Sequence, residues 1–165
     1  MMRKTTIILA AKLVIITAIA HGQSPYLPED LKGFYEQEKI KSLFELNTVM
    51  NPFYLRGDFD GDKKADYVFA VTERKTGKGG MIIYHPTLKN YFVIGAGVEV
   101  SNRPGDDYGW MNAWEVFCKK EVEKGVGEAG TIKLKGDAIL VLKLESSSGL
   151  IYWDGKKYQW CQQGD

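Results

Sequence analysis

The chain has 165 residues, with 22 Lys and Arg against 21 Asp and Glu, so it lacks the strong positive charge expected of a nucleic-acid-binding protein. Aromatic residues make up 12% of the chain and 18 positions are glycine, which is typical of short strands joined by tight turns. Its length suits one ordinary domain with a hydrophobic core.

The first twenty residues have the pattern of a secretory signal peptide. A basic start precedes an apolar stretch over residues 7–20, which Lys12 interrupts once. Ala18-Ile19-Ala20 predicts cleavage after residue 20, and a second small-residue site predicts cleavage after residue 22. Removal of this segment leaves 19 basic and 21 acidic residues, a formal charge of −2. We therefore expect an exported protein, periplasmic or secreted, without stable membrane insertion after cleavage; an uncleaved anchor is the alternative.

The first elements of the remaining chain, residues 24–165, are a helix and two short strands. Pro28 and the acids after it predict a helix start, and Leu31, Phe34 and Tyr35 make one apolar face. Residues 40–56 are ambiguous: a strand is predicted at 43–46, a break at 50–52 and a second strand at 53–56.

The rest of the chain is predicted to be mainly strands. A nearly continuous apolar run at 67–72 predicts a strand covered on both faces, and 81–84 and 91–94 predict a strand pair. Residues 101–109 form a polar loop, 110–117 are apolar but of uncertain type, and 119–130 are predicted to be a solvated connection. Strands are predicted at 138–144 and 150–153, and Asp154-Gly155 predicts a hairpin turn before 158–161. The predicted fold is a single α+β domain, mostly antiparallel sheet with a short N-terminal helix.

An acidic loop, Gly57-Asp58-Phe59-Asp60-Gly61-Asp62-Lys63-Lys64-Ala65-Asp66, directly precedes the most apolar strand. Calcium prefers six to eight oxygen ligands, supplied by alternating carboxylates and a backbone carbonyl. The spacing predicts carboxylate ligands at Asp58, Asp60, Asp62 and Asp66, with the backbone carbonyl of Lys64 between the last two. The alternative is a solvated turn whose aspartates bond their own backbone.

This loop resembles the FG-GAP/VCBS-type calcium loop of integrin α-chain propellers and of related bacterial secreted proteins. The resemblance covers residues 57–71 only and implies ligand roles for the same aspartates. One such loop in about 145 residues excludes a full propeller. The family favours glycine at the sixth loop position, where this chain has Lys63, so we expect a positive φ at that residue at a cost of about 1 kcal/mol or more.

Other residue types that carry chemistry are sparse. Zinc and other metals that prefer nitrogen or sulfur ligands are disfavoured at the loop, because we expect no Cys or His nearby. Cys118 and Cys161 predict either one disulfide or two separate buried thiols. Cleavage after residue 20 would make His21 the N-terminal residue, and His21 with His85 would then supply the ligands of a copper-binding histidine brace. The tryptophans at 110 and 114 are predicted core residues, with an exposed stacking patch as the alternative.

No catalytic set is visible, and the leading hypothesis is a non-enzymatic exported protein with a structural calcium loop that binds a protein or carbohydrate partner. Asp106 and Asp107 are the predicted partner-binding residues. One alternative is a small periplasmic hydrolase that uses His85 and an acid, although no nucleophile motif supports it. Another is an inhibitor or immunity-type protein that acts through the loop around Asp106.

Overall fold

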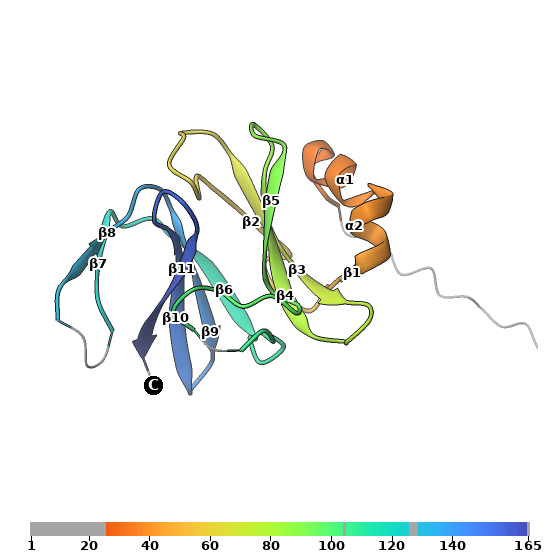
Figure 1. Ribbon diagram of the computed structural model, residues 1–165. Coiled ribbons are helices and arrows are strands. Elements are labelled where there is room, and N and C mark those ends of the chain that lie inside the picture. Colours follow the sequence, from red (N-terminus) through yellow and green to blue (C-terminus); the bar gives the residue numbers. More distant parts are fainter. Residues whose placement is uncertain (1–25, 104, 126–128, 165) are drawn as a thin grey trace, which may run out of the picture.

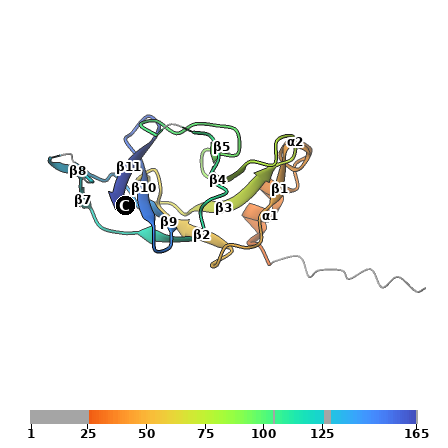
Figure 2. The same ribbon diagram turned by 90° about the horizontal axis from the view of Figure 1, so that it is seen from below.

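The computed structural model describes residues 26–103, 105–125 and 129–164; the predicted signal peptide and His21 lie outside these ranges. Two antiparallel β-sheets face each other, two helices cover the outer side of the first, and a small hairpin lies beyond the second (Figure 1). Seen from below, the helices and the small hairpin lie at opposite ends of the molecule (Figure 2). The predicted predominance of antiparallel sheet is confirmed.

The first sheet contains five strands: β1 Phe44–Leu46, β2 Tyr54–Gly57, β3 Asp66–Glu73, β4 Gly79–His85 and β5 Asn90–Gly95. β1 and β2 pair with the two halves of β3, and β4 and β5 follow on its other side. The predicted strand pair is confirmed, because Ile82 of β4 lies opposite Val93 of β5.

The second sheet contains β6 Ala113–Phe117, β9 Ala138–Lys143, β10 Ser147–Trp153 and β11 Tyr158–Gly164, in the order β11-β10-β9-β6. The predicted hairpin at Asp154-Gly155 joins β10 to β11. The solvated connection predicted at 119–130 is partly wrong, because β7 Glu121–Glu123 pairs with β8 Thr131–Lys133. Val122 of β7 is buried against Leu150 and Cys161 of the second sheet.

Two short helices pack on the first sheet, α1 Glu29–Tyr35 and α2 Glu38–Leu43. The predicted apolar face of α1 is confirmed: Leu31, Phe34 and Tyr35 are buried. The strand predicted at 43–46 begins one residue later, since Leu43 ends α2. In the part of the chain that the structure describes, neither helix has the length and apolar content needed to cross a membrane.

β3 is the central strand of the fold, and both of its faces are buried, as its apolar run predicted. Val68 and Ala70 join the core between the two sheets, whereas Phe69 and Val71 join the core beneath the helices. Consecutive side chains point to opposite faces of a strand, so a strand covered on both sides is apolar throughout. We call the contact between the two sheets the inter-sheet interface.

Cys118 and Cys161 are both free thiols, one exposed and one buried. The disulfide that the sequence left open is therefore not formed in this structure, and burial is found only for Cys161. Trp114 belongs to the core, where its indole N–H donates to the Pro52 carbonyl at 2.8 Å. The prediction of a core tryptophan is confirmed at this position.

Candidate metal centre

The acidic loop connects β2 to β3 at one edge of the inter-sheet interface. Gly57, the last residue of β2, lies opposite Asp66, the first residue of β3, so residues 58–65 form the connection between paired strands. Antiparallel pairing thus returns the chain on itself and brings the first and last predicted ligands close together. The Phe59 N–H donates to Asp66 Oδ2 at 2.8 Å and closes the loop.

The aspartates hold the loop shape by accepting backbone N–H bonds. Asp58 accepts from Gly61 at 2.8 Å and from Lys63 at 3.1 Å. Asp60 Oδ1 accepts from Asp62 at 2.9 Å, and Asp62 Oδ1 accepts from Lys64 at 2.7 Å. The bonds of Asp60 and Asp62, each two residues along the chain, are the Asx turns of the alternative interpretation, and the three carboxylates still come within 4.8 Å of one another.

The loop is joined to the second sheet through the segment that precedes β9. The Asp58 N–H donates to Asp137 Oδ2 at 2.9 Å, and the Asp137 N–H donates to the Asp58 carbonyl at 2.6 Å. Gly61 allows a close approach here, since a Cβ on it would lie 2.6 Å from the Lys135 carbonyl oxygen. The loop therefore connects the two sheets, and Asp137 is a contributor that the sequence reasoning missed.

Lys63 has the positive φ that the sequence predicted. Its φ is 66°, in the left-handed region that a side chain makes costly, and its N–H is bonded to Asp58. Lys63 thus adopts a backbone conformation that glycine reaches without strain. Lys64 follows in an exposed position, and its predicted role as a carbonyl ligand remains a prediction.

His85, the last residue of β4, lies against the loop, so the expectation that no histidine is nearby is wrong. Its Nδ1 is 2.9 Å from Asp66 Oδ1 and 3.3 Å from Asp60 Oδ2. The cause is strand register: Tyr67 of β3 lies opposite Tyr84 of β4, so the next position pairs Asp66 with His85. His85 lies 19 residues beyond Asp66 in the sequence, and only the hairpin brings them together.

The other side of the His85 ring faces the second sheet. Its Nε2 lies 3.0 Å from the Tyr158 hydroxyl, which is also 3.4 Å from the Phe59 carbonyl. The rings of Phe92 and Trp153 surround the imidazole on the remaining sides. Burial and the nearby carboxylates raise the pKa of Tyr158 above its ordinary value, so the phenol stays protonated.

Burial also acts on the loop carboxylates. It raises the pKa of Asp60 above its ordinary value, and the neighbouring Asp66 carboxylate raises it further. The side chains of Asp60, Asp66 and His85 are 9%, 2% and 1% exposed, so water screens their charges weakly. A positive charge at this point would offset the repulsion between the carboxylates.

Two groups of donor atoms in the described residues can hold a metal ion. One is the acidic triplet, Asp58, Asp60 and Asp62, and the other is the mixed cluster, Asp60, Asp66 and His85. In each group the donor atoms lie within 4.8 Å of one another. The structure thus brings all four predicted carboxylates together but divides them between two overlapping groups that share Asp60.

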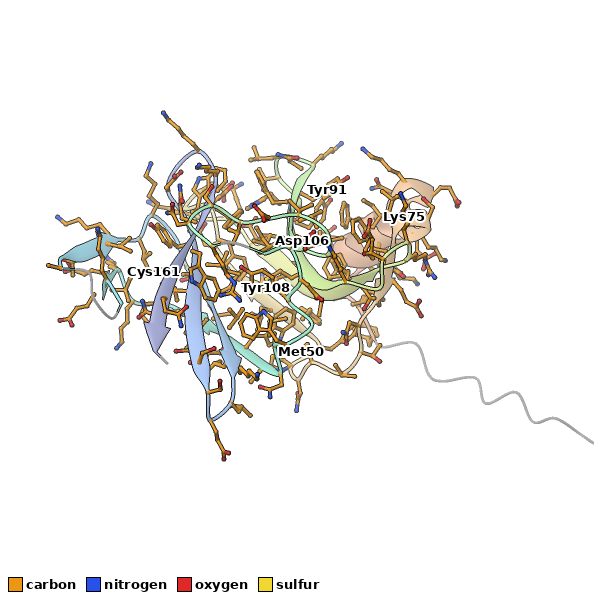
Figure 3. All side chains as sticks on the ribbon, turned by 60° about the horizontal axis from the view of Figure 1, so that its bottom comes forward. Met50, Lys75, Tyr91, Asp106, Tyr108 and Cys161 are labelled. Carbon is orange, nitrogen blue, oxygen red and sulfur yellow. The ribbon has the colours of Figure 1, made fainter. Side chains whose placement is uncertain are left out.

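Asp106 and Asp107 belong to a different loop, which contacts the start of β4; Figure 3 labels Asp106. Asp106 Oδ2 lies 2.5 Å from the Lys78 ammonium, and Asp107 Oδ1 accepts from the N–H groups of Gly79 and Gly109 at 2.9 and 2.8 Å. Their carboxylates fasten this loop to β4. Their role in binding a partner remains a prediction.

Comparison with known proteins finds no match to a family model, to a curated protein or to a solved structure. A functional assignment therefore depends on the geometry and chemistry of the site itself.

Proposed function

We propose that the protein is an exported, non-catalytic binding module, a single α+β domain in which calcium fastens the two sheets together. The observation that carries this proposal is the position of the acidic triplet. Three carboxylates gather in a loop that is hydrogen-bonded to Asp137, the residue just before β9 of the second sheet. A calcium ion there offsets two of the three negative charges and makes the inter-sheet contact depend on the ion.

The main alternative is a hydrolase that uses His85 and an acid. His85 does contact Asp60 and Asp66, as such an enzyme requires, but its side chain is only 1% exposed. A general base has to come within hydrogen-bond reach of the substrate proton. The aromatic rings around His85 exclude a substrate from the imidazole, so this geometry favours holding an ion over catalysis.

A groove between the helices and strands β4 and β5 supports the partner-binding part of the proposal. Tyr84 and Tyr91 line it, with Lys39 and Lys89 among its polar residues. Aromatic faces beside charged groups suit a sugar or a peptide. Tyr91→Ser should reduce retention of the protein on immobilised glycans or peptides that the wild type binds, and retention unchanged in this variant would exclude the groove.

Thermal unfolding in calcium and then in chelator tests the calcium proposal. Calcium at about 100 times its Kd should stabilise the wild type by about 2.7 kcal/mol, which corresponds to roughly 5–10 °C in the midpoint for a domain of this size. Asp60→Ala should unfold at a lower temperature and respond to neither reagent. Asp30→Asn, on the exposed side of α1, is the matched control and should keep the full response. A wild-type midpoint indifferent to both reagents would refute the proposal.

A further inference from the structure

The geometry of the mixed cluster points to a second cation site, beside the calcium position, that takes a small transition-metal dication of the zinc class. Its ligands are Asp60, Asp66 and His85, from the acidic loop, β3 and β4. It shares Asp60 with the acidic triplet but does not depend on calcium binding. Imidazole nitrogen combined with carboxylate oxygen suits zinc and its neighbours, whereas calcium takes oxygen ligands.

The first argument is the state of His85 Nδ1. This nitrogen is buried and, among the described residues, makes no hydrogen bond, although carboxylate oxygens lie 2.9 and 3.3 Å away. A hydrogen bond from a ring nitrogen lies in the ring plane and points at its acceptor. The in-plane direction from Nδ1 therefore points at neither oxygen. With Nδ1 left without a hydrogen bond and the three donor atoms within 4.8 Å of one another, the cluster can hold one ion.

The second argument is the spacing of these atoms. Zinc bonds to nitrogen and oxygen ligands are about 2.0–2.1 Å long, so ligands at angles of about 90–110° lie about 2.9–3.4 Å apart. The two distances from Nδ1, 2.9 and 3.3 Å, fall within that range. Calcium bonds are longer, at about 2.3–2.6 Å, and separate ligands at the same angles more widely.

The third argument is charge. The side chains of Asp60 and Asp66 are 9% and 2% exposed, and when both are ionised they carry two negative charges in a buried place. A divalent cation makes the cluster neutral. Buried charges that lack compensation are strongly destabilising, so the cluster gains more from such an ion than an exposed group of acids would.

The fourth argument is the support around His85. The Tyr158 hydroxyl lies 3.0 Å from His85 Nε2 and 3.4 Å from the Phe59 carbonyl, so its oxygen can accept an Nε2–H while its own proton is shared with that carbonyl. That tautomer places the lone pair on Nδ1. Metal-binding histidines commonly donate their other N–H to an oxygen, which fixes the ring and the tautomer. Tyr158 is thus a positioning residue rather than a ligand.

Titration of the metal-free protein with zinc chloride, followed by calorimetry, tests this inference. We expect one zinc ion per chain. His85→Gln should weaken zinc binding by at least about 100-fold, because even the loss of an outer partner costs about 10–100-fold. Tyr158→Phe should cost about 10–100-fold while leaving the ligands in place. His21→Gln, which changes the other histidine of the chain, should leave zinc affinity unchanged.

Three variants distinguish calcium binding at the acidic triplet from zinc binding at the mixed cluster. Asp62→Asn should lower calcium affinity and spare zinc, since Asp62 belongs to the acidic triplet alone. His85→Gln should do the reverse, and Asp60→Asn should lower both affinities. Zinc binding without a calcium response would refute only the proposed function. A calcium response without zinc binding would refute only this inference.

X-ray absorption at the zinc edge keeps the inference testable if His85→Gln fails to fold. The zinc-loaded wild type should show one imidazole together with oxygen ligands at about 2.0–2.1 Å. The same spectrum in His21→Gln would assign that imidazole to His85. A zinc shell made of oxygen alone, or an imidazole signal lost in His21→Gln, would overturn the assignment.

Discussion

Two clusters lie side by side along the inter-sheet interface: one contains a cation of the chain, and the other consists of two carboxylates and a histidine. In the aromatic cluster the cation belongs to the chain: the Arg103 guanidinium lies over the rings of Trp160, Trp110 and Tyr108 at 4.5, 4.9 and 5.2 Å. Tyr108 lies between the sheets in Figure 3 and is almost fully buried. Attraction between a cation and aromatic faces strengthens when water is excluded.

The mixed cluster contains two carboxylates and an imidazole, and the cation that we propose for it comes from solution. Tyr158 borders the mixed cluster and Trp160 the aromatic one, two residues apart on β11. The comparison shows two ways to use charge at an interface. A cation built into the chain acts under all conditions, whereas a cation from solution makes the contact conditional on its concentration.

The largest expected effect comes from Phe59, the apolar residue inside the acidic loop. Its side chain is fully buried in the core between the sheets. Phe59→Ala should lower the free energy of unfolding by about 3–5 kcal/mol, through lost burial and the cavity that remains. Denaturant unfolding in calcium and in chelator measures this. A loss seen only in calcium would mean that the loop packs against the second sheet only when the ion is bound.

A smaller effect is expected at the aromatic cluster. Arg103→Met keeps an apolar side chain but removes the guanidinium, so stability should fall by about 1–2 kcal/mol. The fall should be the same in calcium and in chelator, because this cation belongs to the chain. Denaturant unfolding of the variant in both solutions is the check. A calcium-dependent loss would show that the two clusters are coupled and would break the distinction between them.

The smallest effect is expected at Asp154, a carboxylate whose partners all come from the chain. Bonds from Gln159, Lys157 and Lys156 lower its pKa from 3.8 to about 2. A lowered folded pKa stabilises the protein above the unfolded value, and this contribution is lost as the pH falls from about 3.8 to about 2. Asp154→Asn should remove that part of the acid dependence in calcium and in chelator alike. Unfolding midpoints measured across this pH range would show it, and an unchanged pH profile would contradict the assignment.

Much of the sheet could be predicted because its patterns are local. The apolar run at 67–72 identified a strand covered on both faces, and Asp154-Gly155 identified the last hairpin. By contrast, α2 buries only Ile40, so it has no apolar period to detect. The short strand β7 is hidden because Val122 stands alone between two glutamates.

The candidate site was predictable only in its acidic half. The loop spacing identified Asp58, Asp60, Asp62 and Asp66, because those ligands lie within nine residues. His85 depends on strand register: Tyr67 pairs with Tyr84, which puts His85 opposite Asp66, and the apolar runs at 67–72 and 81–84 do not by themselves set that register. Asp137 comes from a connection before β9, and nothing in its local sequence marks the contact with Asp58.

The most direct test of a solution cation at the interface is amide hydrogen exchange of the wild type, followed by NMR in calcium and in chelator. Calcium at about 100 times its Kd should slow exchange of the Gly61 and Asp62 amides by about 100-fold, because opening the loop then requires release of the ion. The amides of Tyr108 and Trp160, beside the built-in Arg103, should change much less. Equal slowing in both places, or none in the loop, would contradict the account.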